Sequence, residues 1–301
     1  MNLIEVMDRF PDQEACIHFL EKVRWKGKPE CPHCQSQKLT ERQHETETGR
    51  IGRWNCQDCK ATFRVLHGTL FHGTKIPLQK WFFAISLIVN AKKGISSHQL
   101  ARDLQLNQKT AWYIQVRIRA EMADKVGSVL LLGIVEADET YIGGKPRKSN
   151  QKSTEPSKRG RGTEKDAVIG AVERGGNVVA QLVPDVSGRT ILDFIQRAVK
   201  TDESTLITDE FRSYNKLSET MKHEVINHSV QFVDGDKHTN TIEGFWSLLK
   251  RAWYGTHHHY TTGYTPLYVA ERCYVYNNRH RTNIFWKFLR DSMLVTQPLT
   301  T

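Results

Sequence analysis

Hydrophobic positions along the chain change their spacing from one region to the next, and this spacing predicts the elements. Between residues 78 and 122, apolar side chains recur every three to four positions, which predicts helices. Further along, short apolar runs separated by turn residues predict strands at 130–141, 167–172, 178–183 and 205–209. The second and third runs flank Gly175-Gly176-Asn177, which is typical of a hairpin turn. With helices predicted over 188–199 and 240–252, the order β-β-β-α-β-α indicates an α/β sheet.

The helical region is divided by a break and a short turn. Lys93-Gly94 interrupts the pattern, a short helix follows over 95–104, and Asn107 can cap the next helix. Two helices joined by such a turn are typical of a helix-turn-helix, whose second helix reaches DNA base edges or phosphates. The side chains expected to contact DNA are Gln108, Lys109, Thr110, Tyr113 and Arg117, and Trp112, Gln115 and Arg119 decorate the same helix. An ordinary helical hairpin with solvated charges is the alternative.

Composition narrows the class of protein. The 301 residues are 39% hydrophobic and 25% charged, which allows a folded core and excludes fibrous and disordered classes. Apolar runs such as 81–89 are shorter than the roughly 18 residues of a spanning helix, and the first residues do not have the pattern of a secretion signal. We therefore expect a cytoplasmic protein. The net charge of +10 favours a polyanionic partner, with nucleic acid as the leading candidate.

Much of the positive charge lies in one segment. Residues 143–165 contain eight Lys or Arg, two Glu and no large apolar side chain. Because no core can form from such a segment, we expect an exposed loop between two apolar regions. We predict that Lys158, Arg159 and Arg161 contact DNA phosphates, and a solvated linker is the alternative.

Four of the six cysteines form two Cys-x-x-Cys pairs with 21 residues between them. The pairs are Cys31/Cys34 and Cys56/Cys59. Two such turns supply the four soft thiolates of a closed, structural Zn²⁺ site, whereas redox thiols are the alternative. Short strands predicted at 50–55 and 62–66 complete a zinc ribbon. We expect Cys16 and Cys273 to be small buried residues and not reactive thiols.

Acidic residues stand where predicted strands end and on the last predicted helix. Asp138 lies near the end of the first strand of the sheet and Asp209 ends a short buried strand. Active-site groups of α/β sheets are commonly found at strand ends. Glu243 lies on the polar face of the helix over 240–252, where it could join the two aspartates around a cation. Lys250, two turns on, is available for phosphate.

A structural explanation of the same acids stays open at this point. The segment from Asn240 to Glu243 also fits a capping box, and Asp209 could cap a helix over 211–217. Glu139, beside the first aspartate, is expected on the opposite face of its strand and is the weaker candidate.

These segments together resemble a bacterial insertion-sequence transposase of the DDE type, in the group with an N-terminal zinc ribbon, the IS-fifteen-ninety-five family. The resemblance is carried by the cysteine pairs, the helix-turn-helix, and the segments Val135–Gly144, Leu206–Asp209, His238–Lys250 and Tyr276–Arg279. It implies an RNase H-like catalytic fold with Asp138, Asp209 and Glu243 at the three acidic catalytic positions. The third position varies in this group and can be Asn, so Asn240 is a second candidate there.

The resemblance also implies an activity, cofactors and partners. The expected activity is metal-dependent DNA cleavage and strand transfer at the ends of an insertion sequence, by a two-metal-ion mechanism. The expected cofactors are structural Zn²⁺ and catalytic Mg²⁺ or Mn²⁺, the latter on the three acids. Lys250 and Arg251 are expected to hold phosphates. The expected partner is double-stranded DNA, both the element ends and the target. The protein is expected to be associated with the nucleoid, to form a homo-oligomer on DNA and to have no membrane partner.

The sequence indicates four regions and leaves two other functions open. The regions are an N-terminal helix and zinc ribbon (1–73), a helix-turn-helix (74–126), an RNase H-like DDE domain (127–281) and a C-terminal helical tail (282–301). A non-enzymatic zinc-ribbon DNA-binding regulator would account for the charge and the first two regions. A metal-dependent nuclease without strand joining would account for the acids as well.

Overall fold

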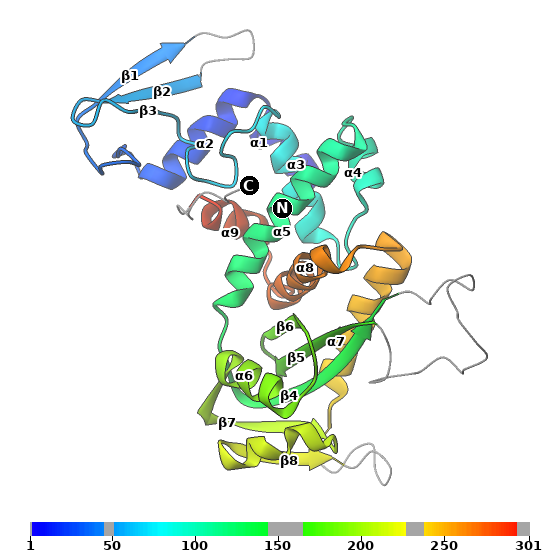
Figure 1. The fold of residues 1–301 in the computed structure, drawn as a ribbon. Helices are drawn as coiled ribbons and strands as arrows, with labels where there is room; N and C mark the ends of the chain where they lie inside the picture. Colours follow the sequence, from blue (N-terminus) through cyan, green and yellow to red (C-terminus); the bar gives the residue numbers. More distant parts are fainter. Residues whose placement is uncertain (1, 45–50, 144–164, 227–237, 294–301) are drawn as a thin grey trace. The chain divides into compact units, whose positions relative to one another are not determined.

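The computed structural model describes residues 2–44, 51–143, 165–226 and 238–293 (Figure 1). Contacts within the chain define two compact units. The first comprises Met1–Ala91, Ser97–Glu121 and Arg281–Thr301, and the second comprises Lys92–Ser96 and Met122–His280. The four regions expected from the sequence stay a prediction beside this division. Among the described helices, none is long and apolar enough to cross a membrane.

The first unit combines a small antiparallel sheet with helices. Its elements are α1 (Leu3–Arg9), α2 (Gln13–Trp25), β1 (Leu39–His44), β2 (Ile51–Cys56), β3 (Thr62–Phe63), α3 (Leu78–Asn90), α4 (Ser97–Asp103), most of α5 (Gln108–Gly127) and α9 (Ile284–Asp291). The three strands follow one another as an antiparallel meander. Trp54 of β2 packs edge-on against Trp25 of α2, with 5.6 Å between ring centroids. This aromatic contact attaches the sheet to the helices.

The zinc ribbon differs in detail from the prediction. The strand expected at 50–55 is β2, whereas the strand expected at 62–66 shrinks to the two residues of β3. Strand β1 was not predicted, because its sequence LTERQH shows no alternation of apolar and polar residues. Its position depends on pairing with β2, which is a tertiary effect.

Helices α4 and α5 are the predicted helix pair. Asn107 caps α5, since its Oδ1 accepts the backbone N–H three residues on at 2.7 Å. Gln108 Nε2 donates to Ser97 Oγ at 2.8 Å, which connects the first turns of the two helices. The expectation that Gln115 and Arg119 decorate the surface of α5 is wrong, because each is only 1% exposed. The buried stripe of α5 runs through positions 111, 114, 115, 118, 119 and 122.

The second unit is built on a five-stranded mixed sheet. Its elements are β4 (Leu131–Ile142), β5 (Asp166–Glu173), β6 (Val178–Val183), α6 (Gly188–Ala198), β7 (Val199–Asp209), a 3₁₀ helix (Arg212–Glu219), β8 (Lys222–Ile226), α7 (Asn240–Arg251) and α8 (Thr265–Asn277). The spatial order is β6-β5-β4-β7-β8. Strand β5 is antiparallel to its neighbours, and β4, β7 and β8 run parallel. A central first strand, a reversed second strand and this order make the sheet RNase H-like, which confirms the expected fold class.

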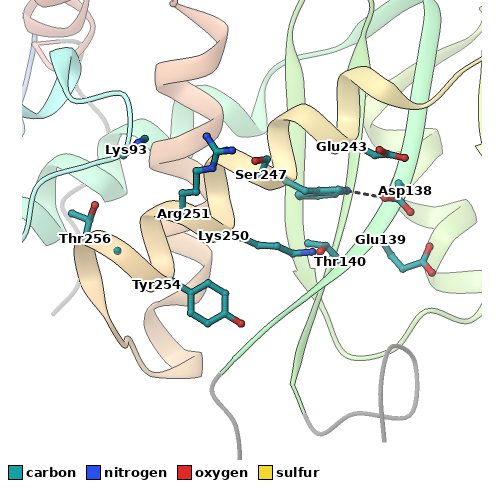
Figure 2. Close-up of a pocket in the computed structure, with 12 residues that line it drawn as sticks. Lys93, Asp138, Glu139, Thr140, Glu243, Ser247, Lys250, Arg251, Tyr254 and Thr256 are labelled. Atoms are coloured by element: carbon teal, nitrogen blue, oxygen red, sulfur yellow. Dashed lines mark hydrogen bonds between the residues drawn. The ribbon is translucent and has the colours of Figure 1, made fainter.

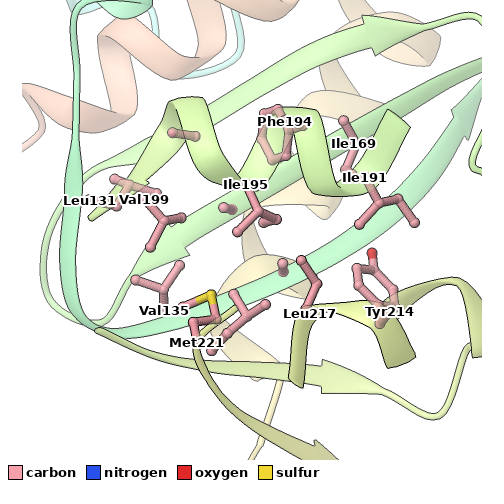
Figure 3. Close-up of a cluster of buried hydrophobic side chains, with 14 of the residues drawn as sticks. Leu131, Val135, Ile169, Ile191, Phe194, Ile195, Val199, Tyr214, Leu217 and Met221 are labelled. Atoms are coloured by element: carbon pink, nitrogen blue, oxygen red, sulfur yellow. The ribbon is translucent and has the colours of Figure 1, made fainter. Parts of the chain in front are cut away.

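Alternation along β4 separates the two faces of this sheet. Val135 and Ala137 belong to the buried apolar cluster under α6 and the 3₁₀ helix (Figure 3). Glu136 and Asp138 point to the other face, where both bond to α7. The first acid of the proposed triad therefore faces the helix that carries the third.

In the second unit, one strand was not predicted, and one predicted helix is a 3₁₀ helix. The edge strand β8 has the sequence KHEVI, in which only Ile226 is buried, so it carries little apolar pattern. Its backbone pairs with β7 in parallel register. The helix expected over 211–217 is the 3₁₀ helix Arg212–Glu219, with Tyr214 and Leu217 buried at its i, i+3 spacing.

Candidate active site

Asp138 lies on β4 with its carboxylate held by α7. Trp246 Nε1 donates to Asp138 Oδ2 at 3.0 Å, drawn as a dashed line in Figure 2. The indole has room because the residue paired with Asp138 on β5 is Gly170. A Cβ at Gly170 would lie 2.5 Å from Trp246 Cη2, well inside van der Waals contact. The absence of a side chain at this strand position thus lets the helix approach the sheet and orient the aspartate.

Asp209 is brought to the same face of the sheet. In the parallel register Glu136 pairs with Ile207, so Asp138 and Asp209, each two residues further, project to one side. Burial raises the pKa of Asp138 from its ordinary value of 3.8 to about 7, and the charges of Glu139 and Asp209 contribute.

Glu139 and Asp209 also have structural partners. Glu139 Oε2 accepts the Tyr214 hydroxyl at 3.1 Å, yet Glu139 also lines the same pocket as Asp138, so its expected orientation away from the site is not met in full. Asp209 Oδ1 accepts the Phe211 N–H at 3.1 Å. The open alternative that Asp209 caps the following helix is wrong, because the residue before the 3₁₀ helix is Phe211 and no side chain caps that helix. The Asp209 carboxylate instead bonds within the turn that precedes the helix.

Glu243 is exposed in the first turn of α7 and lines the same pocket as Asp138. The pocket has a volume of about 890 Å³. In Figure 2, Asp138 and Glu243 lie at one end, and Arg251, Tyr254 and Thr256 lie toward the other. Asp209 is not among the lining residues, and the carboxylate oxygens of the three acids are not all within 4.8 Å of one another in the described chain.

Cationic side chains also line the pocket. Lys250 and Arg251 in the last turn of α7 and Lys93 from the segment after α3 contribute side chains to the lining. Helix α7 continues into a π-helical segment, Ala252–His257, which adds the exposed Tyr254. Single π-helical turns are frequent at functional sites. One continuous helical segment thus presents an acid first and two cations two turns later.

Glu136 fixes the N-terminus of α7 and was missed by the sequence reasoning. This carboxylate is fully buried and accepts the N–H groups of Thr241 and Ile242 at 2.8 and 3.1 Å. Arg174 Nε donates to it at 2.7 Å, and His238 Nδ1 lies 3.2 Å away. The first amides of a helix have no partner within the helix, and the positive end of its dipole favours a carboxylate. The available signal was an acid two positions before Asp138, on the same face of the strand.

The capping box predicted as an alternative for Asn240 and Glu243 is wrong. The residue before α7 is Thr239, and its side chain makes no capping bond to the backbone. Glu243 Oε1 instead accepts the Thr239 hydroxyl at 3.4 Å. The reason is that the Glu136 carboxylate already accepts the N–H groups of Thr241 and Ile242 in the first turn of α7. Asn240 is exposed, and its claim as third metal ligand stays a prediction.

The four paired cysteines converge at one point. The ligand atoms of Cys31, Cys34, Cys56 and Cys59 all lie within 4.8 Å of one another. The Cys31–Cys59 and Cys34–Cys56 Sγ distances are 3.6 and 3.5 Å. Four sulfurs around a tetrahedral Zn²⁺ at 2.3 Å would lie about 3.8 Å apart. The cluster therefore fits zinc. Cys16 and Cys273 are buried, and burial raises the pKa of each thiol to about 12, in line with an unreactive role.

The side chains predicted to contact DNA fall into three groups. On α5, Gln108, Lys109 and Tyr113 are exposed and Thr110 is half-buried, while Arg117 Nη1 donates to the Tyr113 hydroxyl and to a backbone carbonyl within the protein. Lys250 and Arg251 are exposed beside the acids. Lys158, Arg159 and Arg161 lie outside the described residues. All of these contacts stay predictions.

Two family models match this chain. That of the ISXO2-like transposase domain matches residues 130–277, which include all three acids. That of the transposase zinc-ribbon domain matches residues 11–62, which include all four paired cysteines. The chain belongs to this transposase family.

A curated relative within the family is a protein of the transposable element ISH50 from Halobacterium salinarum. It is 28% identical over 265 residues, which cover 82% of this chain and 85% of the relative. Among solved structures, the Mos1 strand transfer complex has 15% identity and a TM-score of 0.29, covering 70% of this chain and 74% of its own. The mariner Mos1 paired-end complex with Mg has 14% identity and a TM-score of 0.25, covering 73% and 81%. The fold assignment rests on the strand order of the transposase domain.

Proposed function

We propose that this protein is a transposase that binds the ends of its insertion sequence and cuts and joins DNA strands with divalent metal ions. The observation that carries the proposal is a pocket in the transposase domain where Asp138 and Glu243 face cationic side chains. An acidic end suits metal ions, and a cationic end suits the phosphates of DNA. The zinc-ribbon match and the net charge of +10 support a DNA partner.

The donor set of the pocket fits Mg²⁺ or Mn²⁺. Carboxylate oxygens are the ligands these hard cations prefer, and Mg²⁺ is commonly held by one or two of them with water in the other positions. Asp138 and Glu243 would hold the ions, with Asp209 beside Asp138. When bound, a pair of ions supplies activation of the attacking oxygen and stabilisation of the leaving oxygen in an in-line displacement.

The surrounding residues have positioning and binding roles in this proposal. Trp246 orients Asp138 through its indole N–H, and Glu136 anchors the start of the helix that carries Glu243. Lys250 and Arg251, on the same helix, hold the phosphates that flank the reacting one. The zinc ribbon and the exposed face of α5 bind the element ends. The protein acts on DNA as a homo-oligomer. The four-cysteine cluster holds structural Zn²⁺.

The test uses DNA that carries the genomic sequence flanking the element as substrate, in Mg²⁺ or Mn²⁺. Asp138→Asn, Asp209→Asn and Glu243→Gln preserve side-chain size but remove the negative charge that holds the ions. We expect all three to bind DNA and to lose both cleavage and joining. Asn240→Ala is the matched control, and full activity is expected for it.

Three outcomes would overturn parts of the proposal. If wild-type protein binds the ends but never cleaves them with either metal, the regulator is the correct function. Cleaved but never joined products would make the protein a nuclease. If Glu243→Gln joins strands normally while Asn240→Ala does not, the third ligand is Asn240.

A further inference from the structure

A second, smaller pocket is formed by residues of the first unit. It has a volume of about 290 Å³ and opens between β2, β3 and the turn that follows β3. Arg53, Arg64, His67 and His72 line it, with threonine hydroxyls between them. Its lining within the described chain contains no Asp or Glu. Four groups that donate hydrogen bonds or carry positive charge therefore share one concave surface without an acidic partner in it.

The turn that forms one wall of this pocket is held from behind. Arg24 of α2 donates to the carbonyl oxygens of Val65 and His67, the latter at 2.7 Å. Arg117 of α5 donates to the carbonyl oxygen of His72 at 2.9 Å. These bonds occupy backbone carbonyl oxygens of the turn. The side chains that face the pocket are left as donors on a fixed backbone, which lowers the cost of ordering them around a ligand.

The two histidines add to the donor character of the pocket. The Gly68 N–H donates to His72 Nδ1 at 3.1 Å, so the neutral His72 ring carries its proton on Nε2. The His67 ring lies 4.7 Å from that of His33 and 4.9 Å from that of His72, measured between centroids. Burial lowers the pKa of His67, and the neighbouring His33, His72 and Arg24 lower it further. A bound anion would offset this repulsion.

We propose that this pocket binds one backbone phosphate of DNA through Arg53, Arg64, His67 and His72. The volume is at the lower limit of pockets that hold small organic ligands, so it suits a single phosphate group. DNA is favoured over a free phosphate because the basic surface continues beyond the pocket. Exposed Arg42 is directly paired with Arg53 across β1 and β2, and paired residues project to the same side of a sheet. The proposal deepens the DNA-binding part of the proposed function and rests on it.

The first test measures binding of end-bearing duplex DNA by zinc-loaded protein without added Mg²⁺ or Mn²⁺ and without chelator, so that catalysis plays no part and the ribbon keeps its zinc. For the double variant Arg53→Gln/Arg64→Gln we expect about a three- to tenfold weaker affinity near 0.1 M salt. We also expect the slope of log affinity against log salt to fall by about 0.9, the value for one phosphate contact. Arg290→Gln, an exposed arginine of α9 in the same unit, is the control and should change neither quantity. An unchanged slope in the double variant would overturn the proposal.

The second test uses wild-type protein and does not depend on a variant that folds. The ring resonances of His67 and His72 are followed by NMR during titration with duplex DNA and, separately, with inorganic phosphate. Shifts with duplex, together with a raised His67 pKa, support the proposal. Shifts with inorganic phosphate but not with duplex would show that the ligand is a free anion, which would overturn the proposal. Because neither test measures cleavage, a failure of the catalytic assignment leaves both results interpretable.

Discussion

Glu136→Gln tests whether the buried carboxylate anchors the helix of the active site. The substitution keeps the volume of the side chain and one carbonyl-type acceptor, but it removes the charge. Arg174 Nε then loses its anionic partner at Oε1, and the N–H groups of Thr241 and Ile242, which both donate to Oε2, keep at best a neutral acceptor in place of a charged one. The change is confined to the second unit, on the face of the sheet that carries Asp138.

The expected cost follows from the burial of this group. Removing one partner of a buried ion pair typically destabilises a protein by about 3–5 kcal/mol. The amide oxygen of Gln can still accept both N–H groups from the position of Oε2, so we expect a cost at the lower end of this range, about 3 kcal/mol. The second unit has about 160 residues, and for this size 1 kcal/mol corresponds to about 2–4 °C in Tm. The transition of this unit should therefore move down by about 6–12 °C.

The measurement is thermal unfolding of the full chain by calorimetry, together with strand cleavage assayed well below the new transition. Glu219→Gln, an exposed acid of the 3₁₀ helix in the same unit, is the control, with an expected change of less than about 0.5 kcal/mol. We also expect kcat of Glu136→Gln to fall, because a less constrained α7 positions Glu243 less well against Asp138. If the variant melts within 1 °C of the control, the anchoring argument is wrong.

Three further predictions concern the two metal sites and their surroundings. Cys56→Ser should lose bound zinc and lower the melting temperature of the first unit, since structural zinc contributes on the order of 10 kcal/mol; full zinc by elemental analysis would contradict this. Without added Mg²⁺ or Mn²⁺, Asp138→Asn should raise Tm at pH 8, because a carboxyl whose pKa is raised to about 7 destabilises the fold once ionised. That gain should shrink as the pH falls from 7 toward 4, where the native aspartate is protonated, and a gain independent of pH would refute the cause. Gly170→Val should displace Trp246 and reduce cleavage, with little effect on DNA affinity measured without added Mg²⁺ or Mn²⁺; normal cleavage would show that the indole is dispensable.

The elements of the sheet that carry strong apolar patterns could be predicted from the sequence. Strand β6 and its hairpin with β5 follow the alternation and the glycine turn almost residue for residue. Strands β1 and β8 could not be predicted, because their few buried side chains leave backbone pairing as the main determinant of their position.

The candidate site divides in the same way. Asp138, Asp209 and Glu243 could be named as candidates because residue type and position suggested a cation site and the family resemblance placed them at the three acidic positions. The role of Gly170 depends on Trp246, which lies 76 positions later in the chain. The role of Glu136 depends on Thr241, which lies 105 positions later. Spacing along the chain carries no information about such partners. A glycine within a strand and an acid on its inward face are the local signs that a search can use.

The arrangement of acid and cations on α7 restricts how this family can vary in length. Lys250 lies seven positions after Glu243, about two turns of helix and about 10 Å of rise. Inserting or deleting one residue between them would rotate the cations by about 100° around the helix axis and carry them out of the pocket. Substitutions along this stretch leave that angle unchanged. Insertions and deletions among related sequences should therefore fall outside positions 243–250, even where residue identity there has drifted.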